Sequence, residues 1–291
     1  MKRHILFSGL VSSALLFLPA LASADTLGVD FENPPYTVGN INGQDGWSKT
    51  GAFDVAVTAT GIPTGFGAQS LRMSDSVTSG SFGDQTFAKP LTNAVGEADS
   101  TDGTFSRGTL QNHFEMQFDI ASVLQTLQTG MHVSVSPDRG DGSRMSYLRF
   151  EDQSGGIHVF FVDVQGTADA DLIAPGVQAN FVETDIATIS RTPHTIKLAM
   201  DLVDGASNDV VKVYVDGVLK ITGTSWENYY RFDTESAAEQ SPRIVKTVLF
   251  RESGTATPAN AGNGFLVDNL SLLSGPTPAS TVTVTIDKFI D

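Results

Sequence analysis

The stretch "HFEMQFDI", residues 113–120, alternates between apolar and polar side chains along its length. Phe114, Met116, Phe118 and Ile120 occupy every second position, and polar residues fill the positions between them. Successive side chains of an extended backbone point to opposite faces. The stretch therefore predicts a β-strand with one face in a core and the other toward water.

The same alternation recurs in "HTIKLAMDLV" (194–203) and "VKVYVDG" (211–217), and the Asp-Gly pair that ends the second stretch favours a tight hairpin turn. The nearly continuous apolar runs at 157–164 and 265–273 are typical of central strands. Clusters of Gly, Asp, Asn, Ser and Pro separate these stretches, and no long segment has helical periodicity. The sequence therefore predicts an all-β sandwich or barrel.

The first 24 residues have the three-part pattern of a secretory signal peptide. A positive start at Lys2 and Arg3 precedes an apolar run, and the small residues at 22–24 match a cleavage site. We expect a signal-peptide helix in residues 1–24, removed before Asp25, and a secreted protein that is extracellular or held at a cell surface; an uncleaved membrane anchor is the alternative. No later apolar run approaches the roughly 20 residues that span a bilayer, so we expect no membrane insertion after removal of the signal.

The composition excludes several classes of protein. The chain has no cysteine, which excludes disulfides, thiolate metal sites and a lipid-modified cysteine. The formal net charge of −15 argues against binding to nucleic acid or anionic membranes, and it would suit bound cations. The roughly 250 residues after the signal are enough for one large domain with its own core.

The composition changes near the end of the chain. Residues 274–280, "SGPTPAS", are predicted to form a linker, and residues 281–291, "TVTVTIDKFID", alternate like one more strand. This tail either pairs with a sheet of the main domain or begins a second module that is truncated. The linker favours the second interpretation.

Five short segments occur in the order seen in concanavalin A-like lectin/glucanase domains: "VDFEN" (29–33), "GQDGW" (43–47), "QSLRMSD" (69–75), "VKVYVDG" (211–217) and "GNGFLVDNLSLL" (262–273). Residues 25–273 resemble the laminin-G-like members found in bacterial secreted proteins, and their two ends are similar to jelly-roll carbohydrate-binding modules. The resemblance implies a two-sheet antiparallel jelly-roll sandwich whose first and last strands lie side by side. It does not fix the function, because the superfamily contains lectins, adhesion modules and glycosidases.

The resemblance also implies a structural calcium ion. Jelly-roll carbohydrate-binding modules often hold Ca²⁺ between a Glu of the first strand and an Asp of the last, and Glu32 and Asp268 occupy the matching positions. Asp268 shares its strand face with apolar residues, where an ionised carboxylate is costly unless it is paired or bound to metal. The alternative is that Asp268 accepts hydrogen bonds from a neighbouring backbone or an arginine.

The catalytic motifs are incomplete. The glucanases of this superfamily carry Glu-x-Asp-x-x-Glu, and the matching positions here are Glu183, Asp185 and Thr188, so the acid/base carboxylate is missing. We expect Glu183 and Asp185 to form a solvated strand face and the protein to be no enzyme. The tripeptide at 139–141, Arg-Gly-Asp, is of the integrin-binding type, and we expect it to form an exposed turn.

Aromatic residues gather directly after the hairpin, in "SWENYYRF" (225–232). One interpretation is an exposed glycan-binding strip in which rings stack on sugars and polar neighbours supply hydrogen bonds. The strip would consist of Trp226, Glu227, Asn228, Tyr229, Tyr230 and Arg231. The alternative is that the rings fold back onto the edge of the sandwich. Trp47 is expected in the core.

We therefore expect a secreted, non-catalytic, lectin-like module that binds a glycan or another cell-surface ligand and holds a structural calcium ion. A spacer or protein-interaction module of a surface protein is the alternative. A glycoside hydrolase is disfavoured by Thr188.

Overall fold

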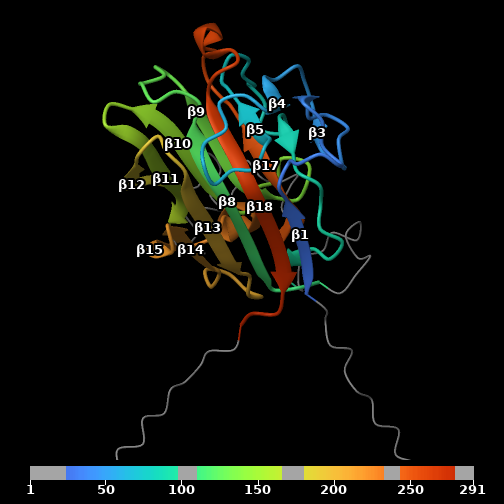
Figure 1. Ribbon diagram of the computed structural model, residues 1–291. Helices are drawn as coiled ribbons and strands as arrows, with labels where there is room; N and C mark the ends of the chain where they lie inside the picture. Colours follow the sequence, from blue (N-terminus) through green and yellow to red (C-terminus); the bar gives the residue numbers. More distant parts are fainter. Residues whose placement is uncertain (1–23, 98–109, 166–179, 233–242, 279–291) are drawn as a thin grey trace, which may run out of the picture.

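The structure is a computed structural model that describes residues 24–97, 110–165, 180–232 and 243–278. Two large antiparallel sheets pack as the layers of a sandwich, which confirms the predicted all-β fold (Figure 1). The nine-stranded sheet has the order β15 (Val218–Gly223), β14 (Val210–Val215), β13 (His194–Asp201), β8 (His113–Ser122), β18 (Phe265–Gly275), β5 (Ser70–Met73), β4 (Val55–Thr58) and β2 (Gly39–Asn40), and β1 (Asp25–Val29) pairs with β18. The seven-stranded sheet has the order β12 (Asn180–Ile189), β11 (Gly156–Gln165), β10 (Tyr147–Gln153), β9 (His132–Asp138), β17 (Thr247–Arg251), β6 (Thr86–Phe87) and β3 (Ser48–Lys49).

The first and last strands lie side by side, as the resemblance implied (Figure 1). The register of β1 and β18 runs from Asp25 opposite Ser274 to Val29 opposite Leu270. Strand β18 continues through Gly275, so its last two residues overlap the start of the segment predicted to be a linker. The predicted signal peptide, apart from Ala24, and the tail at 281–291 lie outside the described residues.

The core lies between the two sheets. The four alternating apolar residues of β8 are at most 1% exposed, and the matching residues of β13 and β14 are also buried. Phe118 of β8 packs edge-on against Phe150 of β10 and Phe250 of β17, with ring centres 5.8 and 6.4 Å apart. Trp47 is 1% exposed and stacks on Phe250, so its predicted place in the core is confirmed.

The two predicted turns are present. Asp216 and Gly217 connect β14 to β15 with φ angles of 50° and 75°, which a two-residue hairpin turn of type I′ requires. The segment 139–141 forms an exposed turn in which Asp138 Oδ1 accepts the backbone N–H of Gly140 at 2.5 Å and of Asp141 at 3.1 Å.

Helix is scarce in the described parts of the chain. A two-stranded sheet of β7 (Val95–Gly96) and β16 (Ile244–Val245) accompanies one short helix, α2 (Glu227–Phe232), and the 3₁₀ turn η2 (Pro258–Asn260). None of the described helices has the length and apolar character needed to cross a membrane.

Candidate functional site

The aromatic stretch after the hairpin is folded into the protein. Trp226 is 6% exposed, and Glu227, Asn228 and Tyr230 are 1–4% exposed. Tyr229 is partly buried and packs against the core. The predicted exposure is therefore wrong for the rings of Trp226 and Tyr230, because rings at this depth have no free face for a sugar. The alternative, in which the rings pack against the sandwich, describes their position.

This stretch forms helix α2 because its polar residues match the helix ends. Ser225 Oγ accepts the backbone N–H of Glu227 at 3.0 Å, and Glu227 and Arg231 place opposite charges at the first and last turns. Trp226 Nε1 donates to the carbonyl of Val162 at 3.0 Å, which fastens the helix to β11. The serine and the order of the two charges were the sequence signals for this helix.

Three buried carboxylates meet beside α2. Potential ligand oxygens of Glu97, Asp209 and Glu227 lie within 4.8 Å of one another. Glu97 forms ion pairs with Arg231 and, at 3.0 Å, with Arg243 Nε. Burial, together with the charge of Glu227, raises the pKa of Asp209 to about 7. Because two guanidinium groups already occupy this cluster, we interpret it as an ion-pair network that holds α2 in place.

The two residues predicted to bind calcium contact the same segment of chain. Glu32 Oε1 accepts the backbone N–H of Ala68 at 2.5 Å, and Asp268 accepts hydrogen bonds from Ser70 Oγ at 3.1 Å and the Asn269 N–H at 2.7 Å. Burial raises the pKa of Asp268 to about 6, and the charge of Glu32 adds to this effect. These contacts match the hydrogen-bonded alternative, and calcium at this pair stays a prediction.

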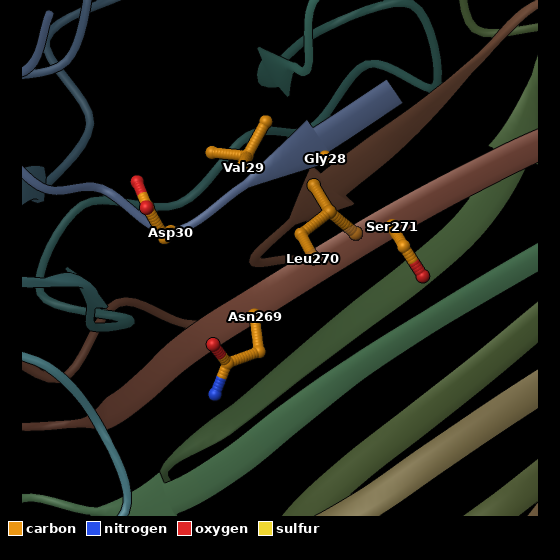
Figure 2. Close-up of a pocket in the computed structure, with 6 residues that line it drawn as sticks. All are labelled: Gly28, Val29, Asp30, Asn269, Leu270 and Ser271. Carbon is orange, nitrogen blue, oxygen red and sulfur yellow. The ribbon is translucent and has the colours of Figure 1, made fainter. Parts of the chain in front are cut away.

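An open depression of about 430 Å³ follows the pairing of β1 with β18 (Figure 2). The side chain of Asn269 at its edge donates to Asp119 Oδ2 at 2.8 Å. None of the lining residues is aromatic: they are Gly28, Val29, Asp30, Asn269, Leu270 and Ser271. The depression therefore has no ring for stacking against a sugar.

A second surface lies on the outer side of the seven-stranded sheet. The strand register aligns one residue from each of five strands, and directly opposed residues of antiparallel strands share a face. We call this set the polar row: Arg251 of β17, Ser134 of β9, Arg149 of β10, Phe160 of β11 and Asp185 of β12. Ser134 and Arg251 are 1% and 6% exposed, so the part of the row that water reaches is formed by the other three residues. With neighbouring strands about 4.8 Å apart, the row is about 19 Å long.

Arg149 is fixed at the centre of the polar row. Its Nε lies 2.9 Å from Glu183 Oε2, and its Nη1 forms an ion pair with Glu151. Its guanidinium carbon lies 4.0 Å from the centre of the Phe160 ring. Partial burial opposes its charge, but the two carboxylates outweigh that effect and hold the pKa of Arg149 above its ordinary value.

A histidine and a carboxylate form the next pair along the sheet. His158 Nδ1 lies 2.7 Å from Asp185 Oδ2. The side chains of Glu183 and Asp185 are 40% and 43% exposed, so the predicted solvated strand face is confirmed. A register shift beside Phe160 places Thr188 directly opposite His158. The hydroxyl of Thr188 therefore lies at the position where the glucanase pattern has its third carboxylate.

An exposed aromatic ring lies at one end of the polar row. Phe82 is 65% exposed, and the buried guanidinium groups of Arg144 and Arg251 each lie 5.0 Å from its ring centre. Arg144 Nη2 also donates to the carbonyl of Phe82 at 2.7 Å, and Arg251 Nη2 donates to that of Ser79 at 3.0 Å. The ring is thus held from below while much of its surface faces water.

The sequence analysis did not identify Phe82, Arg149, His158 or Phe160. The alternation of "YLRFEDQ" (147–153) places Arg149 on the outer face of its strand, so part of the signal was present. The polar row itself depends on pairings between β9, β10, β11, β12 and β17. Register between strands distant in sequence is not visible in a single strand's pattern.

No family model matches this chain, and no curated protein matches it. Several solved structures are similar to it in fold. The alginate lyase Aly36B has 13% sequence identity and a TM-score of 0.42, with 87% of this chain and 97% of the lyase covered.

A carbohydrate esterase, vb_24B_21 from the Shiga toxin-encoding bacteriophage phi24B, has 12% identity and a TM-score of 0.40, covering 79% of this chain and 90% of the esterase. The galectin LEC-6 from Caenorhabditis elegans has 8% identity and a TM-score of 0.30, covering 56% of this chain and 83% of the galectin. Likeness at this level assigns no activity, so the function has to be argued from the residues of this chain.

Proposed function

We propose that this protein is a non-catalytic carbohydrate-binding β-sandwich that binds its glycan along the polar row. The observation that carries the proposal is the arrangement of Arg149, which is held above Phe160 by Glu151 and Glu183. Side chains fixed before binding lose little conformational entropy when a ligand arrives, so such a surface is prepared for recognition.

The chemistry of the surface suits a sugar. A sugar ring presents hydroxyl groups at its rim and C–H groups on its faces, so it is recognised by hydrogen-bonding side chains next to an aromatic ring. His158, Glu183 and Asp185 provide partly exposed donors and acceptors. Phe82 provides the exposed ring at the end of the row.

The charges favour a neutral glycan. Around Arg149, the partly exposed charges of the described residues are this guanidinium and three carboxylates, those of Glu151, Glu183 and Asp185. Arg149 already contacts two of these carboxylates, and the cations at Phe82 are buried beneath the ring. A polyanionic sugar would meet unfavourable charge here, because like charges at an interface repel.

The proposal is tested by a glycan array probed with the wild-type chain, with and without Ca²⁺. We expect neutral oligosaccharides to be bound in preference to uronic-acid oligosaccharides. The variants Phe82→Ala and Arg149→Ala should lose this binding, while Val38→Ala, which changes a side chain that is also exposed, should retain it.

A wild-type chain that binds no glycan, or variants that bind as well as wild type, would overturn the proposal and favour a spacer or protein-interaction module. Release of reducing sugar from a bound oligosaccharide would show that the protein is an enzyme. Secretion is a separate proposal that rests on the first 24 residues, and it is tested by sequencing the N-terminus of exported protein.

A further inference from the structure

Three fully buried polar side chains lie at one rim of the sandwich, where β5 and β17 end and β6 begins. Asp75 follows β5 of the nine-stranded sheet. Gln85 precedes β6, and Glu252 follows β17, both in the seven-stranded sheet. Each of the three is 0% exposed.

The contacts of these side chains leave oxygen atoms without donors. Gln85 Nε2 donates to the backbone carbonyl of Glu252 at 2.8 Å, which brings the amide against that residue. Asn260 Nδ2 donates to Asp75 Oδ1 at 2.8 Å. No other described residue donates a hydrogen bond to the remaining oxygens, which are Asp75 Oδ2, Gln85 Oε1, Glu252 Oε1 and Glu252 Oε2.

The charges around Glu252 do not neutralise it. Burial raises its pKa to about 8, and the nearby carboxylates of Asp75 and Asp54 act in the same direction. Lys49 lies close enough to favour the ionised form, but its ammonium group donates to the carbonyl of Phe53 at 2.7 Å. Arg251, Lys49 and the backbone N–H of Glu252 itself favour the ionised form less than burial opposes it, so this carboxylate is stabilised by a proton or a metal ion.

Two arginines near these side chains have other partners. Arg72 Nη1 lies 2.8 Å from Asp54 Oδ2, so it neutralises that carboxylate. Arg251 lowers the pKa of Glu252, but its side chain extends under Phe82 on the outer face of the sheet. The cluster of Asp75, Gln85 and Glu252 therefore carries an excess of negative charge.

We propose that Asp75, Gln85 and Glu252 bind a calcium ion. All four unpartnered atoms are oxygens, two carboxyl groups and an amide supply them, and Ca²⁺ prefers six to eight such ligands at about 2.3–2.6 Å. The pair Glu32 and Asp268 differs in this respect, because N–H and O–H donors already contact Glu32 Oε1 and both oxygens of Asp268.

The position of the ion gives it a structural role. Asp75 follows a strand of one sheet and Glu252 follows a strand of the other, so a shared ion would tie the two layers together at one rim. Asn260 connects the loop that contains η2 to Asp75, and this loop is ordered by the same ion.

The test is thermal unfolding of the chelator-treated protein in the presence of Ca²⁺. We expect the Tm to rise by roughly 5–10 °C at a calcium concentration about 100 times the dissociation constant. Calcium binds the ionised carboxylate, so the rise should be larger at pH 8 than at pH 5.5. Isothermal calorimetry with CaCl₂ on the same sample should give one site per chain.

Glu252→Gln should abolish the calcium-dependent rise, and Asp75→Asn provides a second variant in case the first does not fold. Glu32→Gln is the matched control and should retain the full rise. The proposal is wrong if wild type shows no calcium dependence, or if the rise persists in both cluster variants. A rise lost only in Glu32→Gln would place the ion at the pair predicted from the sequence instead. These readouts do not involve glycan binding.

Discussion

Arg149 Nε lies 2.9 Å from Glu183 Oε2 and so joins β10 to β12 across the intervening strand β11. The two residues are 34 positions apart in sequence, and the Phe160 ring beneath the guanidinium belongs to the strand between them. These contacts therefore connect three strands at the centre of the polar row, and the side chains are arranged in this way before any ligand binds.

Removing the charge of Glu183 should weaken glycan binding more than it weakens the fold. In Glu183→Gln, Arg149 loses a charged hydrogen-bond partner, and we expect about a 10-fold or greater loss of affinity by calorimetry. The pair is partly exposed, so the free energy of unfolding in urea should change by less than about 1 kcal/mol. Asp204→Asn, in an exposed loop away from the row, is the control. Unchanged affinity in Glu183→Gln would remove this pair from the binding surface.

Replacing Trp226 by alanine should destabilise the protein. Its ring is buried against Tyr147 and Phe181, and truncation of a buried aromatic side chain costs about 3–5 kcal/mol. Urea denaturation measures the effect, with Leu219→Ala as a control because Leu219 is 48% exposed. A Trp226→Ala protein that keeps its stability but loses glycan binding would restore the strip predicted from the sequence.

Asp209→Asn should flatten the dependence of stability on pH. Burial raises the pKa of Asp209 from 3.8 to about 7, so the stability that the neutral carboxyl provides is present below about pH 4 and is lost as the pH rises to about 7. An asparagine stays neutral, and Ser225 Oγ, which donates to Asp209 Oδ2 in the wild type, can rotate to accept. Melting temperatures between pH 4 and 8 should fall less in the variant. Parallel curves for the two proteins would contradict this assignment.

Deleting β1 should expose the edge of β18. Residues Leu270 to Ser274 would lose their hydrogen-bonded partner strand, and an unpaired apolar edge promotes association between molecules. We expect a lower Tm together with dimers or larger species in size-exclusion chromatography. A stable monomer after the deletion would show that β18 does not need its N-terminal partner.

Local patterns in the sequence were sufficient for the layers of the fold. The alternation in 113–120 gave β8 its buried face, and Asp216-Gly217 gave the hairpin, because each depends on neighbouring residues alone. The candidate site was harder to predict, because the polar row depends on the register of five strands. The position of Trp226 was predicted wrongly for a related reason. The polar residues around it suggested an exposed segment, whereas Glu227 is buried and accepts hydrogen bonds from the backbone of Asn208 and Asp209, which are distant in sequence.

The pairing of Asp25 with Ser274 has a consequence for how the domain is connected to its surroundings. Polypeptide that enters ahead of β1 and polypeptide that leaves after β18 emerge next to each other from one pole of the molecule (Figure 1). A larger protein that contained this domain would therefore be joined to it at that pole alone, and the opposite pole would face away from the junction.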